Sequence, residues 1–337
     1  MEKITYENFI TDNKTNKVYL SSLIDKSSGA LDMETRHKLK ADILKFTSDC
    51  GLLYNTRDVW ARDYMPIQLT EDTYLSYIYK PDYLTHFPQC VTNWQLHKVH
   101  VIGQQSKSED SNFKVVQIPI ILDGGNVIKA VVNGKPCIIM CSKVLNENNT
   151  TEKEFCDWWD TWWRDNFDGT EMQLILLPWE GIEDNPIGHA DGMVRYIGND
   201  RVLLTNYQDF DEVFQDDFGK SLIKVLEDAG LEVETLHYLD KFNYKENKLF
   251  RLLFKHTWCY INFLQIGNRI LVPKLGYADL DNEALRQIQE AFKGNKQIVD
   301  VQLTDVDMTS IAEGMTINQN SGGALNCLTW TRYKPQR

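Results

Sequence analysis

Four residues from distant parts of the chain have side chains suited to covalent chemistry: Asp63, His189, Asp191 and Cys327. A guanidinium group is a planar cation whose N–H donors form a fork. Two carboxylates can hold that fork by paired, charge-assisted hydrogen bonds, which fixes its central carbon for attack by a thiolate. A histidine can then protonate the departing nitrogen and later deprotonate the water that resolves the adduct. The set therefore predicts chemistry on a guanidino group without a metal or an organic cofactor.

Cys327 follows two adjacent glycines near the end of the sequence. Gly322 and Gly323 permit a positive φ and a close approach of other groups to the main chain. Leu325, Cys327 and Thr329 alternate with their neighbours, which predicts a short strand that leaves the glycine turn. A buried core thiol is the common alternative for a free cysteine, and the other motifs favour a nucleophile instead.

His189 and Asp191 are two positions apart between Gly188 and Gly192. On a strand both side chains would leave the same face. A single histidine is commonly structural, whereas a histidine and an acid on one face favour function.

Two further motifs combine acids with neighbours that can shape a pocket. In the segment 60–63 we expect Asp63 at the end of a strand, facing a pocket with Trp60 as one wall. A structural ion pair of Asp63 with Arg62 is the alternative. In the segment 123–126, strand, glycine turn and strand describe a hairpin, but a hairpin does not explain why Asp123 and Asn126 bracket the glycines.

Strands and helices alternate along the sequence without a linker, which predicts one compact α/β domain over residues 1–337. The helix at 151–166 carries an aromatic face, which indicates packing or an oligomer contact. The expected helices are 33–49, 151–166, 217–229 and 281–292, and the expected strands are 17–20, 118–122, 127–128, 137–141, 174–177, 194–197, 202–205, 258–266, 269–273 and 298–301.

The composition excludes several classes of protein. A formal net charge of −12 argues against nucleic-acid binding, which depends on Lys and Arg, and suits a cationic substrate. Seven cysteines are an odd number scattered through the chain, so no disulfide framework is expected, and Cys137 and Cys141 fit a strand better than a zinc site. No signal peptide or membrane span is visible, so we expect a cytoplasmic protein without membrane partners.

Taken in order, the motifs resemble those of the guanidino-group-modifying superfamily, nearest to the agmatine deiminases and the Porphyromonas-type peptidylarginine deiminases. The resemblance covers nearly the whole chain. It rests on Trp60-Ala61-Arg62-Asp63, Asp123-Gly124-Gly125-Asn126, Gly188-His189-Ala190-Asp191, Tyr260-Ile261-Asn262-Phe263, Ile270-Leu271-Val272-Pro273, Gly276, and Gly322-Gly323 with Cys327 and Thr329.

This resemblance implies a five-bladed α/β propeller, the pentein fold, with the site at its centre. By the same resemblance Cys327 is the nucleophile, His189 the acid–base group, and Asp63 and Asp191 the guanidinium ligands. We expect the substrate to be bound also by Trp60, Asp123, Asn126, Asn262 and Gly323. The expected reaction is hydrolytic deimination through a thiouronium intermediate, with no cofactor or metal.

Two departures from the family pattern keep other functions open. Asn326 stands where the family has a histidine before the cysteine, and Met65 where it has a glycine. A propeller that binds guanidino ligands without turnover, and an amidinotransferase, are the alternatives to a deiminase.

The segment between Asp63 and Trp163 contains no arginine that could clamp a substrate carboxylate. Agmatine lacks that carboxylate and ends in an ammonium, which suits an acidic protein with aromatic residues near the site. We therefore rank agmatine first, arginine in a peptide or protein second, and free arginine third.

Overall fold

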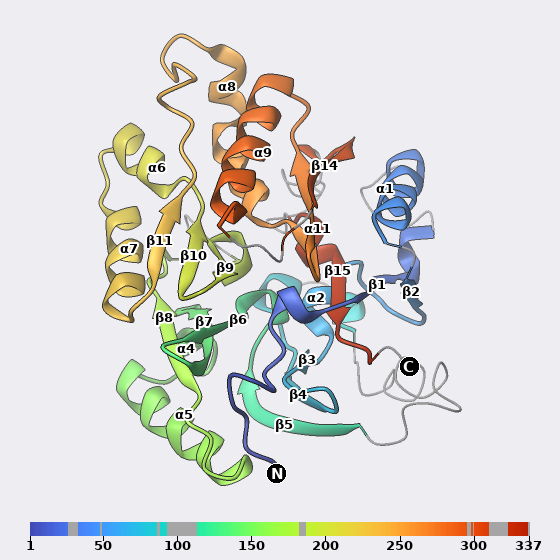
Figure 1. The fold of residues 1–337 in the computed structure, drawn as a ribbon, viewed down its shortest axis with the longest axis vertical. Helices are drawn as coiled ribbons and strands as arrows, with labels where there is room; N and C mark the ends of the chain where they lie inside the picture. The colour runs from blue at the N-terminus through green and yellow to red at the C-terminus, as the bar shows by residue number, and fades with distance from the viewer. Residues whose placement is uncertain are drawn as a thin grey trace.

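The computed structural model describes residues 1–25, 33–47, 49–85, 88–92, 113–181, 187–294, 298, 300–309 and 323–335. Within them the chain forms five three-stranded sheets around a common centre (Figure 1). In each sheet the middle strand pairs antiparallel with one neighbour and parallel with the other. This is the predicted five-bladed α/β propeller, and a blade below means one sheet with the chain that connects its strands.

The strands follow the chain from blade to blade, except in the first. That blade combines β15 (Thr329–Arg332), β1 (Lys17–Ser21) and β2 (Cys50–Leu53), so the two ends of the chain close the ring. The others contain β3 (Ile67–Gln68), β4 (Thr73–Ile78) and β5 (Lys114–Ile121); β6 (Ile128–Val132), β7 (Lys135–Cys141) and β8 (Gln173–Leu177); β9 (Val194–Gly198), β10 (Arg201–Leu204) and β11 (Glu232–Thr235); and β12 (Leu264–Ile266), β13 (Arg269–Lys274) and β14 (Asp300–Asp307).

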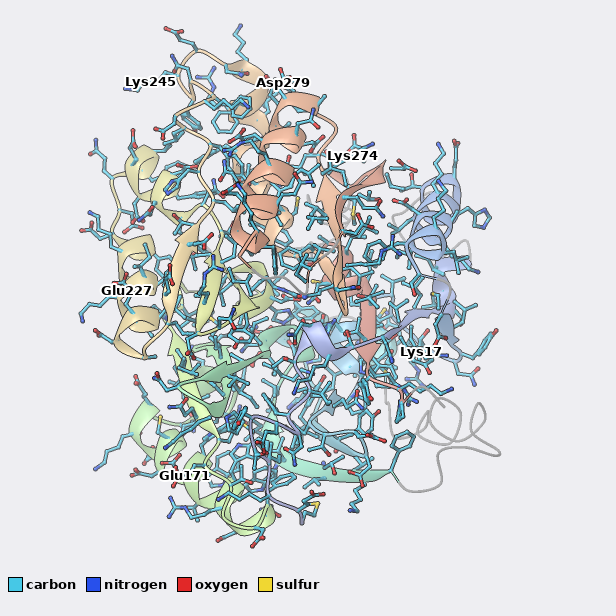
Figure 2. All side chains as sticks on the ribbon, in the orientation of Figure 1. Lys17, Glu171, Glu227, Lys245, Lys274 and Asp279 are labelled. Carbon is cyan, nitrogen blue, oxygen red and sulfur yellow. The ribbon has the colours of Figure 1, made fainter. Side chains whose placement is uncertain are left out.

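Helices lie in the connections between parallel strands, which cannot be joined by a tight turn. Figure 1 shows α1, α5, α7 and α9 toward the outside of the ring, with β6, β9 and β15 nearer its centre. The helices are α1 (Met33–Phe46), α4 (Lys143–Glu147), α5 (Glu152–Asn166), α6 (Tyr207–Phe214), α7 (Phe218–Asp228) and α9 (Ala278–Phe292), and α8 (Lys248–Leu253) joins two blades. Charged side chains such as Glu171, Glu227 and Lys245 are exposed around the periphery (Figure 2).

The aromatic face predicted for residues 151–166 is the buried face of α5. Thr151 and Glu154 form a capping box that satisfies N–H groups at the start of the helix. Phe155, Trp159 and Trp163 are buried, and the Trp159 indole N–H donates to the Met172 carbonyl over 2.9 Å. The face therefore packs in a core that β7 shares with β4 and β5 of the neighbouring blade. None of the described helices is long and apolar enough to cross a membrane.

Five short helical segments link each blade to the next. They are α2 (Ala61–Tyr64), η6 (Gly124–Asn126), η7 (Ala190–Gly192), η8 (Phe254–Ile261) and α11 (Leu325–Leu328). Neighbouring segments touch: α2 contacts α11 and η6, η6 contacts η7, and η7 contacts η8. Because they meet around the centre, residues far apart in sequence come together there.

The N-terminal segment, residues 1–16, crosses all five blades. It includes η1 (Asp12–Lys14), which lies near the centre of the ring in Figure 1. At least one bond goes to each blade. Examples are Ile4 N–H to Thr170 Oγ1, Ile10 N–H to the Leu69 carbonyl, Asp12 to Arg195, Thr15 Oγ1 to the Gln265 carbonyl, and Asn16 N–H to the Arg332 carbonyl. The segment therefore ties the blades together on one side of the propeller.

Most expected strands and helices are present, but several local predictions are wrong. Residues 123–126 do not close a hairpin, because β5 and β6 belong to different blades. The expected strand 258–266 is a strand only over β12, since its first part lies in η8. Cys327 lies in α11 and not in a strand. The expected turn residue Gly322 lies outside the described residues.

Candidate active site

The predicted site residues lie on or beside the five connecting segments. Asp63 belongs to α2, Asp191 to η7 and Cys327 to α11, while His189 directly precedes η7. The expectation of strand ends at Asp63, and of a shared strand face for His189 and Asp191, is therefore wrong in local structure. A single helical turn is too short to leave a sequence period, so alternation suggested strands.

His189 lies between two carboxylates. Its Nε2 is 3.0 Å from Asp123 Oδ2, and its Nδ1 is 3.7 Å from Asp63 Oδ1. The Gly125 N–H donates to Asp63 Oδ1 over 3.1 Å. A Cβ on Gly125 would come within 2.5 Å of His189 Nδ1 and 2.7 Å of Asp63 Oδ1, so a glycine is needed for this close approach.

This arrangement perturbs both ionisable groups. Burial disfavours the charged imidazolium, but the carboxylates of Asp63, Asp123 and Asp191 outweigh it and raise the pKa of His189 to about 9. Burial raises the pKa of Asp63 to about 7; the His189 charge opposes this rise and Asp123 adds to it. His189 is therefore an imidazolium near neutral pH, poised to give up a proton.

Cys327 lies on another side of the same centre. Its thiol is 3.3 Å from Asn262 Oδ1 and 3.5 Å from Asp191 Oδ2, and its backbone N–H donates to Asn262 Oδ1 over 3.2 Å. Burial raises the pKa of Cys327 well above that of a free thiol, and Asp191 and Asp63 raise it further. The protein's own groups therefore favour the protonated thiol.

Asn262 joins two connecting segments. Its Nδ2 donates to the backbone carbonyl of Asp191 over 3.1 Å, while its Oδ1 faces Cys327. Its own carbonyl accepts from the Asn326 N–H over 3.0 Å. Asn262 thus fixes the separation of Asp191 from Cys327.

The backbone of Gly323 packs against the indole ring of Trp60. A Cβ on Gly323 would come within 2.2 Å of the Trp60 ring, so the backbone lies directly against the indole. Trp60 is 6% exposed and forms a largely buried wall of apolar atoms. The glycine therefore has a steric role at this position, as the sequence suggested for its motif.

Asn126 is engaged with the main chain. Its Oδ1 accepts from the Cys141 and Ala190 N–H groups over 2.6 and 3.2 Å, and its Nδ2 donates to the Cys141 carbonyl over 3.1 Å. These bonds hold η6 to β7 and to the start of η7. Its predicted contact with substrate stays a prediction, whereas its positioning of the segment next to His189 is directly visible.

Sequence reasoning missed Tyr83, which has no motif or periodic neighbour to mark it. The hydroxyl of Tyr83 donates to Asp63 Oδ2 over 3.2 Å, and its ring meets that of His189 edge-on at 6.1 Å between centroids. Tyr83 lies in η3 (Asp82–Leu84), which is anchored by an ion pair of 2.8 Å between Asp82 and the buried Lys143. A neighbouring blade thus holds the tyrosine over the carboxylate.

Arg62 does not form the ion pair with Asp63 that the sequence offered as an alternative. Among the described residues its guanidinium bonds to Asn326 and Thr331. Arg62 thus points away from Asp63 toward the segment that carries Cys327, and the Asp63 carboxylate is left to Gly125, Tyr83 and His189.

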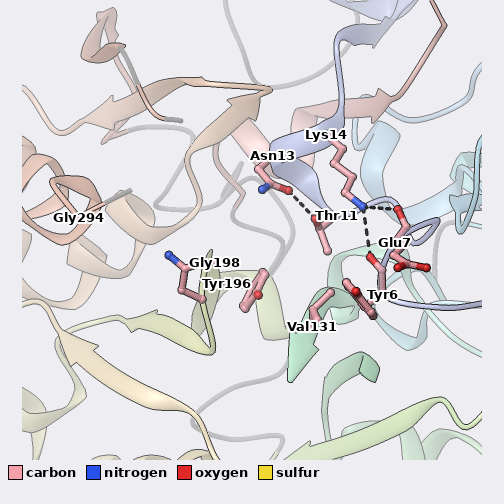
Figure 3. Close-up of a pocket in the computed structure, with 10 residues that line it drawn as sticks. Tyr6, Glu7, Thr11, Asn13, Lys14, Val131, Tyr196, Gly198 and Gly294 are labelled. Atoms are coloured by element: carbon pink, nitrogen blue, oxygen red, sulfur yellow. Dashed lines mark hydrogen bonds between the residues drawn. The ribbon is translucent and has the colours of Figure 1, made fainter. Parts of the chain in front are cut away.

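A separate cavity of about 660 Å³ lies between the N-terminal segment and the third and fourth blades (Figure 3). Its lining includes Thr11, Lys14, Val131 and Tyr196, and none of the predicted site residues. The Lys14 ammonium there donates to backbone carbonyls of the same segment, over 3.0 Å to Glu7 and 2.7 Å to Phe9. This cavity is therefore distinct from the candidate active site.

Comparisons with known proteins identify the family and the fold of the whole chain. The sequence pattern of the Porphyromonas-type peptidyl-arginine deiminase family matches residues 33–330. No curated protein matches the sequence significantly.

Solved structures of agmatine deiminases share the fold at low sequence identity. The agmatine deiminase of C. jejuni is 18% identical, with 98% of this chain and 97% of that chain covered and a TM-score of 0.61. A variant of that enzyme with substrate bound is 17% identical, with the same coverage and a TM-score of 0.64. The agmatine deiminase of Enterococcus faecalis is 15% identical, with 99% and 98% covered and a TM-score of 0.63.

Proposed function

The chain belongs to the Porphyromonas-type peptidyl-arginine deiminase family, and we propose that it hydrolyses a guanidino substrate to a ureido product and ammonia. Cys327 acts as nucleophile, His189 as acid and base, and Asp63 and Asp191 hold the guanidinium. Asp123, Trp60, Asn262 and Gly323 complete the binding site. No metal or cofactor enters this scheme.

The observation that carries the proposal is the excess of buried carboxylates. Asp63, Asp123 and Asp191 are all buried around one imidazole, and among the described residues His189 is the cation within ion-pair distance of the first two. Buried charges that lack a counterion are costly. Asp123 Oδ1 is buried without a hydrogen-bond partner in the described part of the chain. A cation with several N–H donors, such as a guanidinium, would supply both the missing counterion and a hydrogen-bond donor for Asp123.

The reaction begins when the cationic substrate enters. Its positive charge beside Cys327 favours loss of the thiol proton to solvent, which leaves the thiolate that burial and the carboxylates otherwise disfavour. The thiolate sulfur bonds to the central guanidino carbon, and the carbon–nitrogen π electrons move onto nitrogen. His189 gives its proton to one amino group, which leaves as ammonia when its bond to carbon breaks. The product of this half is a thiouronium adduct on Cys327.

The second half reverses the role of the imidazole. His189 is now neutral and takes a proton from water, whose oxygen bonds to the same carbon. The carbon–sulfur bond then breaks, which returns the thiolate and leaves a carbonyl in the ureido product. The remaining proton of that water leaves the oxygen for solvent as the carbonyl forms. Water is consumed, and one ammonia and one proton are released, so atoms and charges balance.

We rank agmatine first among substrates. The two C. jejuni structures and the E. faecalis structure are agmatine deiminases, and the segment between Asp63 and Trp163 contains no arginine for a substrate carboxylate. Arginine in a peptide or protein ranks second because the family name describes that activity. Free arginine ranks third.

A colorimetric assay for ureido groups tests the proposal with agmatine, an arginyl peptide and free arginine in parallel. We expect product with agmatine and a kcat/KM for agmatine that exceeds the value for free arginine. A tenfold preference for free arginine, about 1.4 kcal/mol of transition-state binding, would overturn the ranking. No product from any of the three guanidines, with folded protein, would overturn the enzyme itself. Added amines should yield no new guanidino product, which separates hydrolysis from amidino transfer.

A further inference from the structure

We propose that Asn326 is a positioning residue that holds the Asp191 carboxylate in its guanidinium-binding orientation and is itself held by Arg62. The inference deepens the proposed function and rests on it. The carboxamide of Asn326 is buried directly beside the predicted nucleophile, yet none of its polar atoms is directed at a substrate role in the scheme above.

Arg62, Asn326 and Asp191 form a chain of two hydrogen bonds, called the relay below, in which each residue donates to the next. Asn326 Nδ2 donates to Asp191 Oδ2 over 2.7 Å. Asn326 Oδ1 accepts from Arg62 Nη2 over 2.9 Å, and its backbone carbonyl accepts from Arg62 Nε over 3.4 Å. A carboxamide can serve both neighbours at once because it carries a donor and an acceptor on one planar group.

The relay joins three of the connecting segments that carry the predicted chemistry. Arg62 is bonded in sequence to Asp63, Asn326 to Cys327, and Asp191 belongs to η7. Among the described residues, both hydrogen bonds donated to the Asp191 carboxylate reach Oδ2, from Asn326 and from the Cys327 thiol. The other oxygen of Asp191 is thereby left for a ligand.

The amide does not titrate, so it supports Asp191 equally at all pH values where the enzyme is folded. An aspartate has the same shape but can donate to Asp191 only while the pair shares a proton. Loss of that proton as pH rises would leave two adjacent carboxylates that repel each other. Asn326 hydrogen-bonds to Arg62 from α2 and to Asp191 in η7. The other charged and titratable groups that act on Asp191 are Asp63 from α2, His189 before η7, Arg195 from β9 and Cys327 from α11.

The decisive experiment measures kcat/KM for agmatine against pH for the wild type and Asn326→Asp. We expect the ratio of kcat/KM of the variant to that of the wild type to fall at least about tenfold from the lowest to the highest pH at which both proteins stay folded, because the shared proton is lost as pH rises. A purely structural role would lower the ratio by the same factor at every pH. Asn243→Asp adds the same charge at an exposed acceptor and should leave the ratio near one throughout.

Two more variants test whether Asn326 acts through its hydrogen bonds or only through its volume. Neutral histidine also has one N–H donor and one ring acceptor, so Asn326→His should retain kcat/KM within about tenfold near pH 8. Asn326→Ala removes both functions and should lose about a hundredfold at all pH values. A ratio for Asn326→Asp that does not change with pH, or an alanine variant as active as the wild type, would overturn the inference.

Calorimetry of agmatine with Cys327→Ser, alone and combined with Asn326→Asp, makes this test independent of turnover. If the wild type proves inactive, the proposed function fails. The relay still predicts that the double variant loses agmatine affinity relative to the single variant as pH rises. Equal affinities across pH, or no agmatine binding to Cys327→Ser, would overturn the relay as well.

Discussion

The thiol of Cys327 lies 3.5 Å from Oδ2 of Asp191, and no cationic side chain among the described residues hydrogen-bonds to that sulfur. A buried thiol beside a carboxylate has a raised pKa, because the thiolate would be both poorly solvated and repelled. Cys327 is therefore a poor nucleophile until a cation binds beside it. A guanidinium bound between Asp63 and Asp191 would lower the pKa of this thiol and favour the thiolate.

The first prediction concerns the reactivity of this thiol. At neutral pH iodoacetamide should modify Cys327 more slowly than the half-buried Cys156, whereas a haloacetamidine, which carries a planar cation, should modify Cys327 first. Mass spectrometry of digested protein after short exposures measures both rates. Agmatine should protect Cys327 and leave Cys156 unaffected. Rapid modification of Cys327 by the neutral reagent would contradict the raised pKa.

The second prediction concerns pH. Asp63 must be ionised to bind a guanidinium, so kcat/KM should fall as pH drops through about 7, where burial has moved its pKa. His189 must be protonated to release ammonia, so kcat/KM should also fall as pH rises through about 9. The expected profile is a narrow bell between these values, measured by initial rates at low substrate concentration.

The variant Asp123→Asn tests whether His189 causes the fall in kcat/KM at high pH, the upper limb of the bell. Asp123→Asn removes a carboxylate that raises the pKa of His189, so the upper limb should move to lower pH. A limb that stays in place, or moves to higher pH, would show that another group is the acid.

Much of the ring could be predicted from the sequence, because strands such as 137–141 are short apolar runs and helices such as 151–166 have a clear period. The residue types at Asp63, His189, Asp191 and Cys327 likewise suggested the chemistry. Their local structure could not be predicted, since one helical turn at a blade junction has no period of its own. Neither could the contacts of Tyr83 or of Asn326, which depend on segments twenty or more residues away.

The third prediction concerns Tyr83. Tyr83→Phe removes the hydroxyl that donates to Asp63, so the carboxylate loses a bond that stabilises its charged form. Loss of about 1 kcal/mol corresponds to a decrease in kcat/KM of roughly fivefold. Tyr79→Phe is the matched control, because the Tyr79 hydroxyl lies 3.4 Å from that of Tyr83 and its ring packs on Tyr64. If both variants behave alike, the bond to Asp63 has no role.

The fourth prediction concerns Gly323. Gly323→Ala would place a methyl group against the Trp60 ring and displace the indole from the site wall. Overpacking of this kind costs about 1–3 kcal/mol, and we expect KM for agmatine to rise at least about tenfold. Gly294→Ala is the control, since its nearest atom would be in ordinary contact at 3.6 Å. A KM that stays within twofold of the wild type would exclude Trp60 from substrate binding.

The covalent adduct provides the most direct measurement of the central claim. Folded protein is mixed with agmatine, quenched in acid within milliseconds, digested and examined by mass spectrometry. The mechanism predicts an amidine-bearing adduct on the peptide that contains Cys327, formed before free ureido product and missing from Cys327→Ser. An adduct on a different cysteine, or turnover by Cys327→Ser at the wild-type rate, would contradict it.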